Sequence, residues 1–391
     1  MSPDKKISVL MITGVYLPEI NGAVFQCSQL INNLRKFINY SILTGTSNDL
    51  TYGSDHTDDV LVTRVFMPKK QKLKFIFGAA WFYIQLIREL RKVDLVHVHG
   101  FSNRNAIVII ISLIFNRKVI LKMTSFGHDD PMTIKSCSLI KWKIFSYCHA
   151  YIGLSPAFLR SFKKTELLEY KYSFIPNGVD LNRYFQVTQN EKNVLRVKYG
   201  YSAQDKIIIF VGHFSTEKRP MYLYRAWVKL CELNICIKLI FIGHTRNNFE
   251  VDESIVKSIR KDAFQRGLLP LVNFVEETLY VDEYMKIADT FILPSIREGL
   301  PNVLLEAMAC ALPCIVSELP GVTDWLIDDG VNGVLFRSDD PDVLAAKIGF
   351  LFSEHGLRQK MGSAARHLIE SNFASELTAQ KMLDLYIKTM N

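Results

Sequence analysis

The feature that most constrains the fold is an alternation of strands and helices that occurs twice along the chain. One series begins at the continuous apolar segment Ile7–Thr13 and the other at Lys206–Val211. Continuous apolar strands are typical of parallel sheets that are covered on both faces. Right-handed βαβ crossovers between such strands give a doubly wound sheet. The chain is therefore predicted to be an α/β protein with two Rossmann-like domains.

The length and the turn residues place the expected domain boundaries. A chain of 391 residues is too long for one typical core. Pro176-Asn177-Gly178 is predicted to be the turn that ends the first sheet, and the polar stretch Val187–Asn193 is predicted to be a linker. We expect domains at residues 1–185 and 186–373, followed by a final helix at 374–391.

The charge of the chain is unevenly distributed. Residues 1–185 hold 24 Lys and Arg against 13 Asp and Glu, a net charge of +11, whereas residues 186–391 carry −3. A basic first half suggests an anionic partner, such as a membrane surface or a diphosphate-linked acceptor. Neither a zinc-finger nor a ribonucleoprotein signature accompanies this charge, so nucleic acid is not an expected partner.

Two basic, aromatic segments lie in this first half. The segment Lys69–Arg91 reads KKQKLKFIFGAAWFYIQLIRELR, and the segment Ile134–Tyr147 repeats the same character. Such a helix can lie on an anionic membrane, with its aromatic rings at the headgroup level and its lysines on the phosphates. It can equally be an ordinary crossover helix packed on the sheet. Peripheral contact with a membrane is therefore one of two open interpretations.

The cysteines and the apolar runs bear on the expected compartment. The seven cysteines form no CxxC pair, and no signal peptide precedes Ile7. The longest apolar runs are shorter than the roughly 18 residues needed to span a bilayer. We expect a cytoplasmic protein with reduced thiols, and any membrane contact would be peripheral, on the inner face of the plasma membrane.

The stretch Ile292–Cys314 carries the clearest chemistry. It reads ILPSIREGLPNVLLEAMACALPC and is predicted to form a strand, a short loop and a helix. Glu298 lies in the loop and Glu306 one turn inside the helix, so both can face one crevice. The helix N-terminus favours a phosphate. Two carboxylates beside an anion site would repel it unless they bind neutral hydroxyls, such as those of sugars.

Loops of the first half offer further candidates. Gly22 stands where the first helix begins and can let a ligand approach the backbone, although a plain tight turn is an alternative and GxGxxG is absent. His97 and His99 end one strand, and TSFGHDD at 124–130 follows another. Either histidine can be an ordinary partly buried imidazole. His128 is the better functional candidate because Gly127 and Asp129 flank it in a polar turn.

Several segments together resemble the retaining family 4 glycosyltransferases, the E-x7-E enzymes with a GT-B fold. IREGLPNVLLEAMACALPCIVSELPG resembles their signature, VGHFSTEKRP their phosphate loop, and FIPNGVDLNRY their interdomain turn. YMKIADTFILPS is similar to the approach to the signature, and YLPEINGA to the first glycine loop. The resemblance implies two Rossmann-like domains facing a central cleft, with a final helix that crosses back to the first domain.

The resemblance also implies roles for residues of this chain. Glu306 would bind the nucleotide ribose, Glu298 the hydroxyls of the donor sugar, and Lys218 the diphosphate. His213 stands where many relatives have arginine, and the adjacent Arg219 can compensate. The donor-binding residues expected on this basis are Gly22, His213, Lys218, Arg219, Gly243, Val275, Glu298, Gly299, Leu300, Pro301, Asn302, Val303 and Glu306.

In the first domain, the resemblance implies a histidine after the strand that ends at Met123. His128 is assigned to that role and, with Glu298 and Lys218, to the catalytic group, although it lies a few residues from the family position. His99 and Asp129 are candidates on the acceptor side.

The expected reaction moves a hexose-type sugar from a UDP- or GDP-sugar to a hydroxyl of a glycan or lipid-linked acceptor, with retained configuration. No D-x-D motif follows a strand in the sequence, so neither a metal nor a cofactor beyond the nucleotide-sugar co-substrate is expected. Two alternatives are a nucleotide-sugar epimerase of the same fold and a non-catalytic sugar-nucleotide-binding scaffold.

Overall fold

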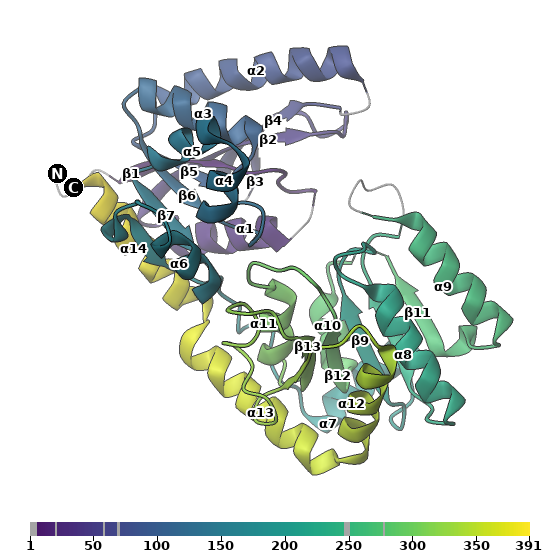
Figure 1. Ribbon diagram of the computed structural model, residues 1–391. Coiled ribbons are helices and arrows are strands. Elements are labelled where there is room, and N and C mark those ends of the chain that lie inside the picture. Colours follow the sequence, from purple (N-terminus) through teal and green to yellow (C-terminus); the bar gives the residue numbers. More distant parts are fainter. Residues whose placement is uncertain (1–5, 20–21, 58, 69–70, 246–250, 277) are drawn as a thin grey trace. The chain divides into compact units, whose positions relative to one another are not determined.

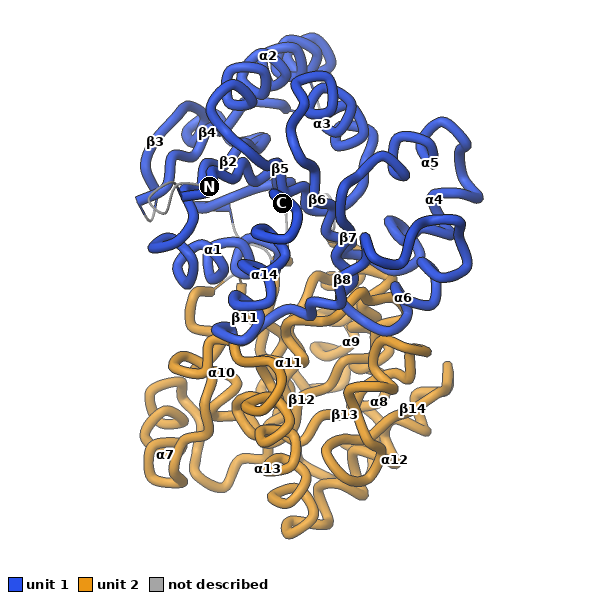
Figure 2. The backbone as a smooth tube through the Cα atoms, turned by 90° about the vertical axis from the view of Figure 1, so that its left-hand side faces the viewer, with its two compact units in different colours: residues 1–178, 375–391 blue, residues 179–374 orange. Residues whose placement is uncertain are grey.

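The chain forms two compact units. The computed structural model describes residues 6–19, 22–57, 59–68, 71–245, 251–276 and 278–391 (Figure 1). Unit 1 comprises Met1–Gly178 together with Ser375–Asn391, and unit 2 comprises Val179–Ala374 (Figure 2). The boundary therefore falls after Gly178 rather than at the predicted residue 185, and the chain returns to unit 1 for its last helix.

In its described part, unit 1 holds one eight-stranded sheet of order β3-β4-β2-β1-β5-β6-β7-β8. Only the pairing of β3 with β4 is antiparallel among these strands. The strands are β1 (Ile7–Ile12), β2 (Ile38–Thr46), β3 (Gly53–Thr57), β4 (Val60–Phe66), β5 (Leu95–His99), β6 (Lys118–Lys122), β7 (Ala150–Gly153) and β8 (Tyr172–Phe174). The exposed edge strand β3, with sequence GSDHT, lacks the apolar pattern of the others and was not predicted.

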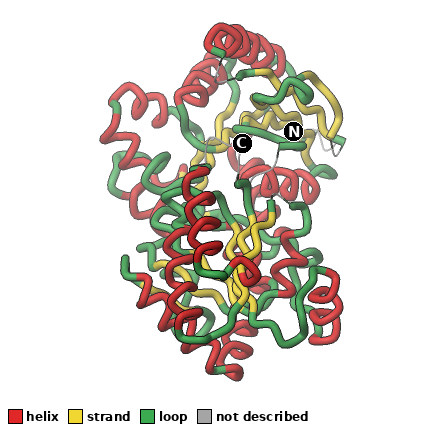
Figure 3. The backbone as a smooth tube through the Cα atoms, turned by 90° about the vertical axis from the view of Figure 1, so that its right-hand side faces the viewer, coloured by secondary structure: helices red, strands yellow, loops and turns green. Residues whose placement is uncertain are grey.

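Helices cover the unit 1 sheet, as the red and yellow tubes of Figure 3 show. They are α1 (Gly22–Leu34), α2 (Lys72–Leu90), α3 (Asn103–Ile114), α4 (Pro131–Cys137), α5 (Leu139–Ser146), α6 (Pro156–Lys163), the 3₁₀ turn η1 (Glu169–Lys171) and α14 (Ser375–Met390). The last helix, α14, packs against α1. Two expected features fall partly outside the described residues: positions 20 and 21 of the glycine loop, and Lys69 and Lys70 of the basic segment.

Unit 2 repeats the architecture with a parallel sheet whose six strands, within the described residues, have the order β11-β10-β9-β12-β13-β14. The strands are β9 (Ile207–Val211), β10 (Lys238–Ile242), β11 (Val272–Val275), β12 (Thr290–Leu293), β13 (Cys314–Ser317) and β14 (Val334–Phe336). The helices are α7 (Gln189–Lys198), α8 (Pro220–Glu232), α9 (Glu253–Gln265), the 3₁₀ turn η2 (Leu269–Leu271), α10 (Val281–Ile287), α11 (Asn302–Ala309), α12 (Pro341–Ser353) and α13 (His355–Asn372).

The core of unit 2 explains why its strands read as continuous apolar runs. All five residues of β9 are buried because helices cover the sheet on both faces. Phe210, Phe214 and Phe241 pack together at the carboxyl ends of β9 and β10. Trp227 of α8 is wholly buried and donates its indole N–H to the carbonyl of Ile237 at 2.8 Å, so its polar atom is satisfied.

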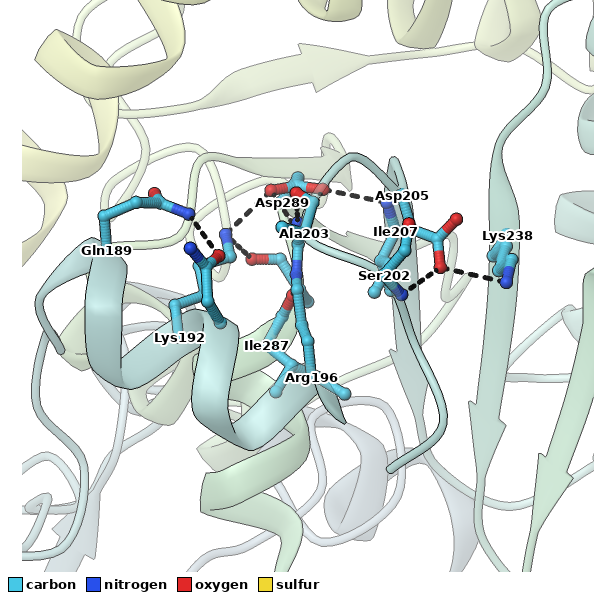
Figure 4. A network of polar contacts seen from close by, with 12 residues as sticks. Gln189, Lys192, Arg196, Ser202, Ala203, Asp205, Ile207, Lys238, Ile287 and Asp289 are labelled. Atoms are coloured by element: carbon cyan, nitrogen blue, oxygen red, sulfur yellow. Dashed lines mark hydrogen bonds and ion pairs between the residues drawn. The ribbon is translucent and has the colours of Figure 1, made fainter. Parts of the chain in front are cut away.

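The prediction of a linker at Val187–Asn193 is wrong, because this polar stretch begins helix α7. Thr188 and Glu191 form a reciprocal capping box at its N-terminus. On the inner face, Arg196 forms two bonds of 2.8 and 2.9 Å with Asp289, and Lys192 reaches the same carboxylate at 2.7 Å (Figure 4). Ion pairs to Asp289 thus attach α7 to the rest of unit 2. The helix lacks the apolar stripe by which a helix is recognised in a sequence.

In the part of the chain that is described, no helix is both long enough and apolar enough to cross a membrane.

Candidate active site

The sheet topology of unit 2 identifies where a ligand can bind. From β9 the chain proceeds outward to β10 and β11, whereas β12, on the other side of β9, leads to β13 and β14. In doubly wound sheets, ligands bind beyond the carboxyl ends of the strands at such a reversal. The loops that follow β9 and β12 contain the predicted residues Lys218 and Glu298.

Direct contacts join these two loops. The Nζ atom of Lys218 lies 2.6 Å from Oε1 of Glu298. Next to this pair, the backbone N–H of Ile296 donates to the carbonyl of Glu217 at 2.9 Å. The side chains of Arg297 and Glu217 form a second ion pair at 2.5 Å. Two ion pairs, each between residues 80 positions apart in sequence, therefore join the two loops into one polar surface.

The Lys218–Glu298 pair is largely shielded from water. The side chain of Glu298 is 8% exposed and that of Lys218 is 23% exposed. Shielding strengthens the attraction between opposite charges. The lysine ammonium has three N–H donors, so one can bond Glu298 while the others bond an incoming anion.

Helix α11 begins next to this pair, as the strand, loop and helix prediction requires. Gly299, Leu300 and Pro301 are buried and lead into the helix. Pro301 is its N-cap and supplies no capping side chain. The helix dipole therefore places partial positive charge beside Lys218 and Glu298, with Asn302 and Val303 in the first turn. Glu306 follows one turn later on the same helix.

Residues that the sequence analysis gave no role surround Glu306. Tyr184 hydrogen-bonds its carboxylate and Arg183 lies close enough to attract it. Arg183 in turn pairs with Asp282 at 3.1 Å. Burial raises the pKa of Glu306 to about 7, against the opposing effects of Arg183 and Tyr184. The carboxyl of Glu306 is thus poised between its neutral and charged forms near neutral pH.

Long-range contacts fix the position of Tyr184. Arg366 of α13 donates to the carbonyl of Tyr184 at 2.7 Å and to the carbonyl of Ala309, at the end of α11, at 2.6 Å. One guanidinium therefore ties the segment after Gly178 to the helix that carries Glu306. The two bonds span 182 and 57 residues, so no local sequence pattern indicates them.

Glycines at the ends of β9 and β10 allow their loops to touch. A Cβ on Gly243 would come within 2.2 Å of the carbonyl oxygen of Gly212, and Gly243 has a φ of 149°. The N–H of Gly243 donates to the carbonyl of Val275 at the end of β11. The predicted donor-binding residues Gly243 and Val275 are therefore brought together. His213 stacks on His244, which was not predicted, with a centroid separation of 6.1 Å.

Arg219 is oriented differently from its neighbour Lys218. It has a left-handed backbone conformation, with a φ of 53°, at the N-cap of α8. Its guanidinium pairs with Asp339 at 2.9 Å and lies over the ring of Tyr222. Arg219 would have to leave Asp339 to bind a phosphate beside Lys218, and its expected donor-binding role stays a prediction.

The corresponding strand reversal of unit 1 lies between β1 and β5. Gly22 is the first residue of α1 and is exposed. His99, at the end of β5, is 9% exposed, contacts Sγ of Cys27 at 3.5 Å and stacks on His97. Burial lowers the pKa of His99 well below its usual value. Direct contact between His99 and an acceptor therefore stays a prediction, and its visible role is packing.

The loop after β6 carries His128 and Asp129 in different settings. Asp129 is 1% exposed and accepts hydrogen bonds from the backbone N–H groups of Thr124 and Ser125 and from the Thr124 hydroxyl. These bonds fix the loop, and a role for Asp129 on the acceptor side stays a prediction. His128 is exposed beside it. The side chain is therefore accessible to a ligand, and its catalytic role stays a prediction.

Among the described residues, no group of three or more His, Cys, Asp or Glu side chains is arranged to hold a metal ion. Independence from metal stays a prediction.

Comparison with known proteins identifies a family that unit 2 resembles. Residues 191–368, nearly the whole of unit 2, match the family described as "Glycosyl transferases group 1". Over these residues the chain is similar to the group 1 glycosyltransferases. This finding confirms the resemblance to the family 4 enzymes, which the sequence motifs indicated.

Curated glycosyltransferases align with the chain at modest identity. N-acetyl-alpha-D-glucosaminyl L-malate synthase of Bacillus anthracis is 28% identical over 309 residues, covering 77% of this chain and 76% of that protein. UDP-Gal:alpha-D-GlcNAc-diphosphoundecaprenol alpha-1,3-galactosyltransferase of Escherichia coli is 27% identical over 221 residues, 56% of this chain and 54% of that protein. Several of the relatives align over only a little more than half of their length.

A solved structure shows the same fold. Anabaena Alr3699/HepE, in complex with UDP and glucose, has a TM-score of 0.78 and 17% identity, covering 98% of this chain and all of that one. The predicted GT-B fold with two Rossmann-like units is thereby confirmed.

Proposed function

We propose that the protein is a retaining, metal-independent hexosyltransferase. It transfers a sugar from a nucleoside diphosphate donor to a hydroxyl group of a glycan or lipid-linked acceptor, in the synthesis of a surface polysaccharide or glycolipid. The observation that carries this proposal is the Lys218–Glu298 pair at 2.6 Å, beside the N-terminus of α11, the helix that carries Glu306 in its second turn. The match of unit 2 to the group 1 glycosyltransferases and the names of the relatives support it.

Each charged group has a task that suits its chemistry. Lys218 and the N-terminus of α11 stabilise the charge that grows on the departing diphosphate, an effect of about 3–4 kcal/mol for one pre-organised donor. Glu298 accepts hydrogen bonds from hydroxyls of the transferred sugar. Glu306 accepts them from the ribose. UDP and glucose in the similar HepE structure are consistent with such a donor.

The reaction follows from this division of charge. The bond between the anomeric carbon and the diphosphate oxygen breaks, and the acceptor oxygen forms the new bond on the same face of the sugar. The leaving phosphate oxygen takes the proton of the acceptor hydroxyl. No side chain is required as a covalent nucleophile, and Glu298, already paired with Lys218, is assigned to binding rather than attack.

The test is Glu298→Gln in the purified full-length chain. Labelled UDP- and GDP-hexoses are incubated with a membrane lipid extract, and nucleotide binding is measured by calorimetry. We expect transfer to fall at least about 100-fold while nucleotide binding changes little, because the lost charge contacts the sugar and not the nucleotide. Unchanged transfer would overturn the role of Glu298.

Glu232→Gln is the matched control, since Glu232 also forms an ion pair in unit 2, with Arg266 at 2.9 Å on the surface. It should leave transfer unaltered. The products also separate the alternatives. An epimerised donor without transfer identifies an epimerase, whereas binding of a nucleotide sugar without any turnover identifies a scaffold.

A further inference from the structure

An apolar and basic surface covers one side of unit 1. Helix α2 packs against α3, and α3 packs against α5, so the three form one outer layer (Figures 1 and 2). We use "outer layer" for the outward faces of α2, α3 and α5. These faces carry large apolar side chains, whereas surface helices ordinarily present polar residues to water.

Helix α2 shows the contrast most clearly. Its inner face is fully used, because Phe82 and Leu86 are wholly buried and a Cβ on Gly78 would meet the carbonyl oxygen of Phe66 at 2.1 Å. Its outer face is apolar as well. Leu73 and Phe77, one turn apart, are each 73% exposed, and this stripe continues through Trp81 (47%) and Ile84 (44%).

The two other helices extend this surface. Ile107, Ile110 and Ile114 recur at helical spacing along the outside of α3, and Ile114 is 75% exposed. At the start of α5, Leu139 and Ile140 are 78% and 76% exposed. The exposed apolar area therefore spans three helices. An apolar area of this extent is typical of an interaction surface.

Positive charge surrounds the apolar side chains. Lys72 and Lys74 begin α2, and Lys141 and Lys143 lie on α5; within the residues that the structure describes, none of the four forms an ion pair. The single acidic residue in the three helices is Glu89, which is buried and pairs with Lys92 at 2.7 Å. The occupant of the outer layer must therefore be anionic at its surface and apolar beneath.

We propose that the outer layer docks on a bilayer surface that contains anionic phospholipid. Phe77 and Trp81 would enter the headgroup region while the lysines meet the phosphates. A second copy of the chain fits less well. A symmetric interface would bring the same unpaired lysines together, without carboxylates on the layer to neutralise them.

The test is vesicle sedimentation with the full-length chain. We expect binding to vesicles of phosphatidylcholine with about 30% phosphatidylglycerol, weakening with added salt, and little binding to phosphatidylcholine alone. Lys72→Gln/Lys74→Gln should weaken binding about fivefold for each lysine, and Phe77→Ser/Trp81→Ser at least as much. Trp81 fluorescence should shift to the blue on binding, and Trp81→Phe should remove this shift.

Helix α9 of unit 2 supplies the matched controls. This helix also carries exposed lysines and a 72% exposed phenylalanine, which are altered in Lys257→Gln/Lys261→Gln and in Phe264→Ser. Neither variant should change vesicle binding. Equal binding by wild type and outer-layer variants would overturn the proposal. So would a dimer in light scattering that the outer-layer substitutions dissociate, because the surface would then join two copies. Vesicle binding needs neither donor nor acceptor, so its failure would leave the proposed transferase untouched.

Discussion

Units 1 and 2 place polar side chains at the same point of similar sheets, but the two clusters differ in charge. In unit 2 the ion pair of Lys218 and Glu298 is within reach of a ligand. In unit 1 the carboxyl halves of β5 and β6 supply His97, His99 and Lys122, all buried. Lys122 donates to the neutral side chain of Asn177 at 2.7 Å rather than to a carboxylate.

Burial keeps most of the unit 1 cluster uncharged. It lowers the pKa of His97 to about 3 and that of Lys122 to about 8, and it raises the pKa of the Cys27 thiol to about 12. The difference follows from what covers each sheet. Helices α1 and α14 place Cys27 and Tyr386 directly on the histidines of unit 1. The sheet topology thus fixes where a site can form. The helices that cover the sheet determine whether the side chains there stay charged and accessible to a ligand.

The sharpest test of this contrast is Lys218→Met. Removing the ammonium should reduce transfer about 100- to 1,000-fold, because the diphosphate loses its nearest side-chain cation in the transition state. Steady-state kinetics with the preferred donor would measure the change in kcat. The thermal midpoint should stay within a few degrees of wild type. Lys229→Met, at an exposed lysine of α8, is the control. Transfer that survives in Lys218→Met would place the diphosphate elsewhere and break the comparison.

The fold was largely readable from the sequence because its strands are buried on both faces. Segments such as Ile207–Val211 and Thr290–Leu293 have no polar alternation and so indicate a parallel sheet. Two of the missed elements have the opposite cause. Helix α7 is anchored by the polar side chains of Lys192 and Arg196, and the edge strand β3 is exposed, so neither presents an apolar pattern.

The site could be predicted only where its residues lie in ordered motifs. The motifs placed Lys218 and Glu298 on two loops, and the structure joins those loops. The surroundings of Glu306 could not be predicted in the same way. Tyr184 contacts Glu306 from the segment after Gly178, and Arg366 of α13 fixes its position through a hydrogen bond to its carbonyl. Such contacts between distant segments form only in the completed fold.

In unit 1, Tyr386→Phe tests whether α14 holds the buried cluster. The Tyr386 hydroxyl lies 2.7 Å from Nδ1 of His97, and both residues are wholly buried. Losing this bond leaves a buried polar atom unpaired and should destabilise the protein by about 1–2 kcal/mol. Thermal unfolding should then begin about 2–4 °C lower for each kcal/mol. Nucleotide binding to unit 2 should be unchanged. A Tyr386→Phe variant that unfolds like wild type would show that α14 packs without this bond.

The smallest expected effect concerns pH and distinguishes Glu306 from the histidines of unit 1. The pKa of Glu306 is raised to about 7, whereas burial keeps His97 neutral throughout the physiological range. Ribose hydroxyls donate best to the ionised carboxylate, so nucleotide affinity should fall as pH drops from 8 to 6, by less than about tenfold. Calorimetry across this range should show a flatter profile for Glu306→Gln.

Stability should change with pH in the opposite sense. Because the folded state raises the pKa of Glu306 above its unfolded value of 4.5, its protonated form is favoured by folding. The contribution of Glu306 to the free energy of unfolding is fully present below about pH 4.5 and is lost as pH rises towards 7. Glu306→Gln removes this loss, so the variant should gain stability relative to wild type as pH rises. If the free energy of unfolding changed with pH in parallel for both proteins, Glu306 would not titrate in this range. Its carboxyl would then keep one charge state near neutral pH, like the histidines of unit 1.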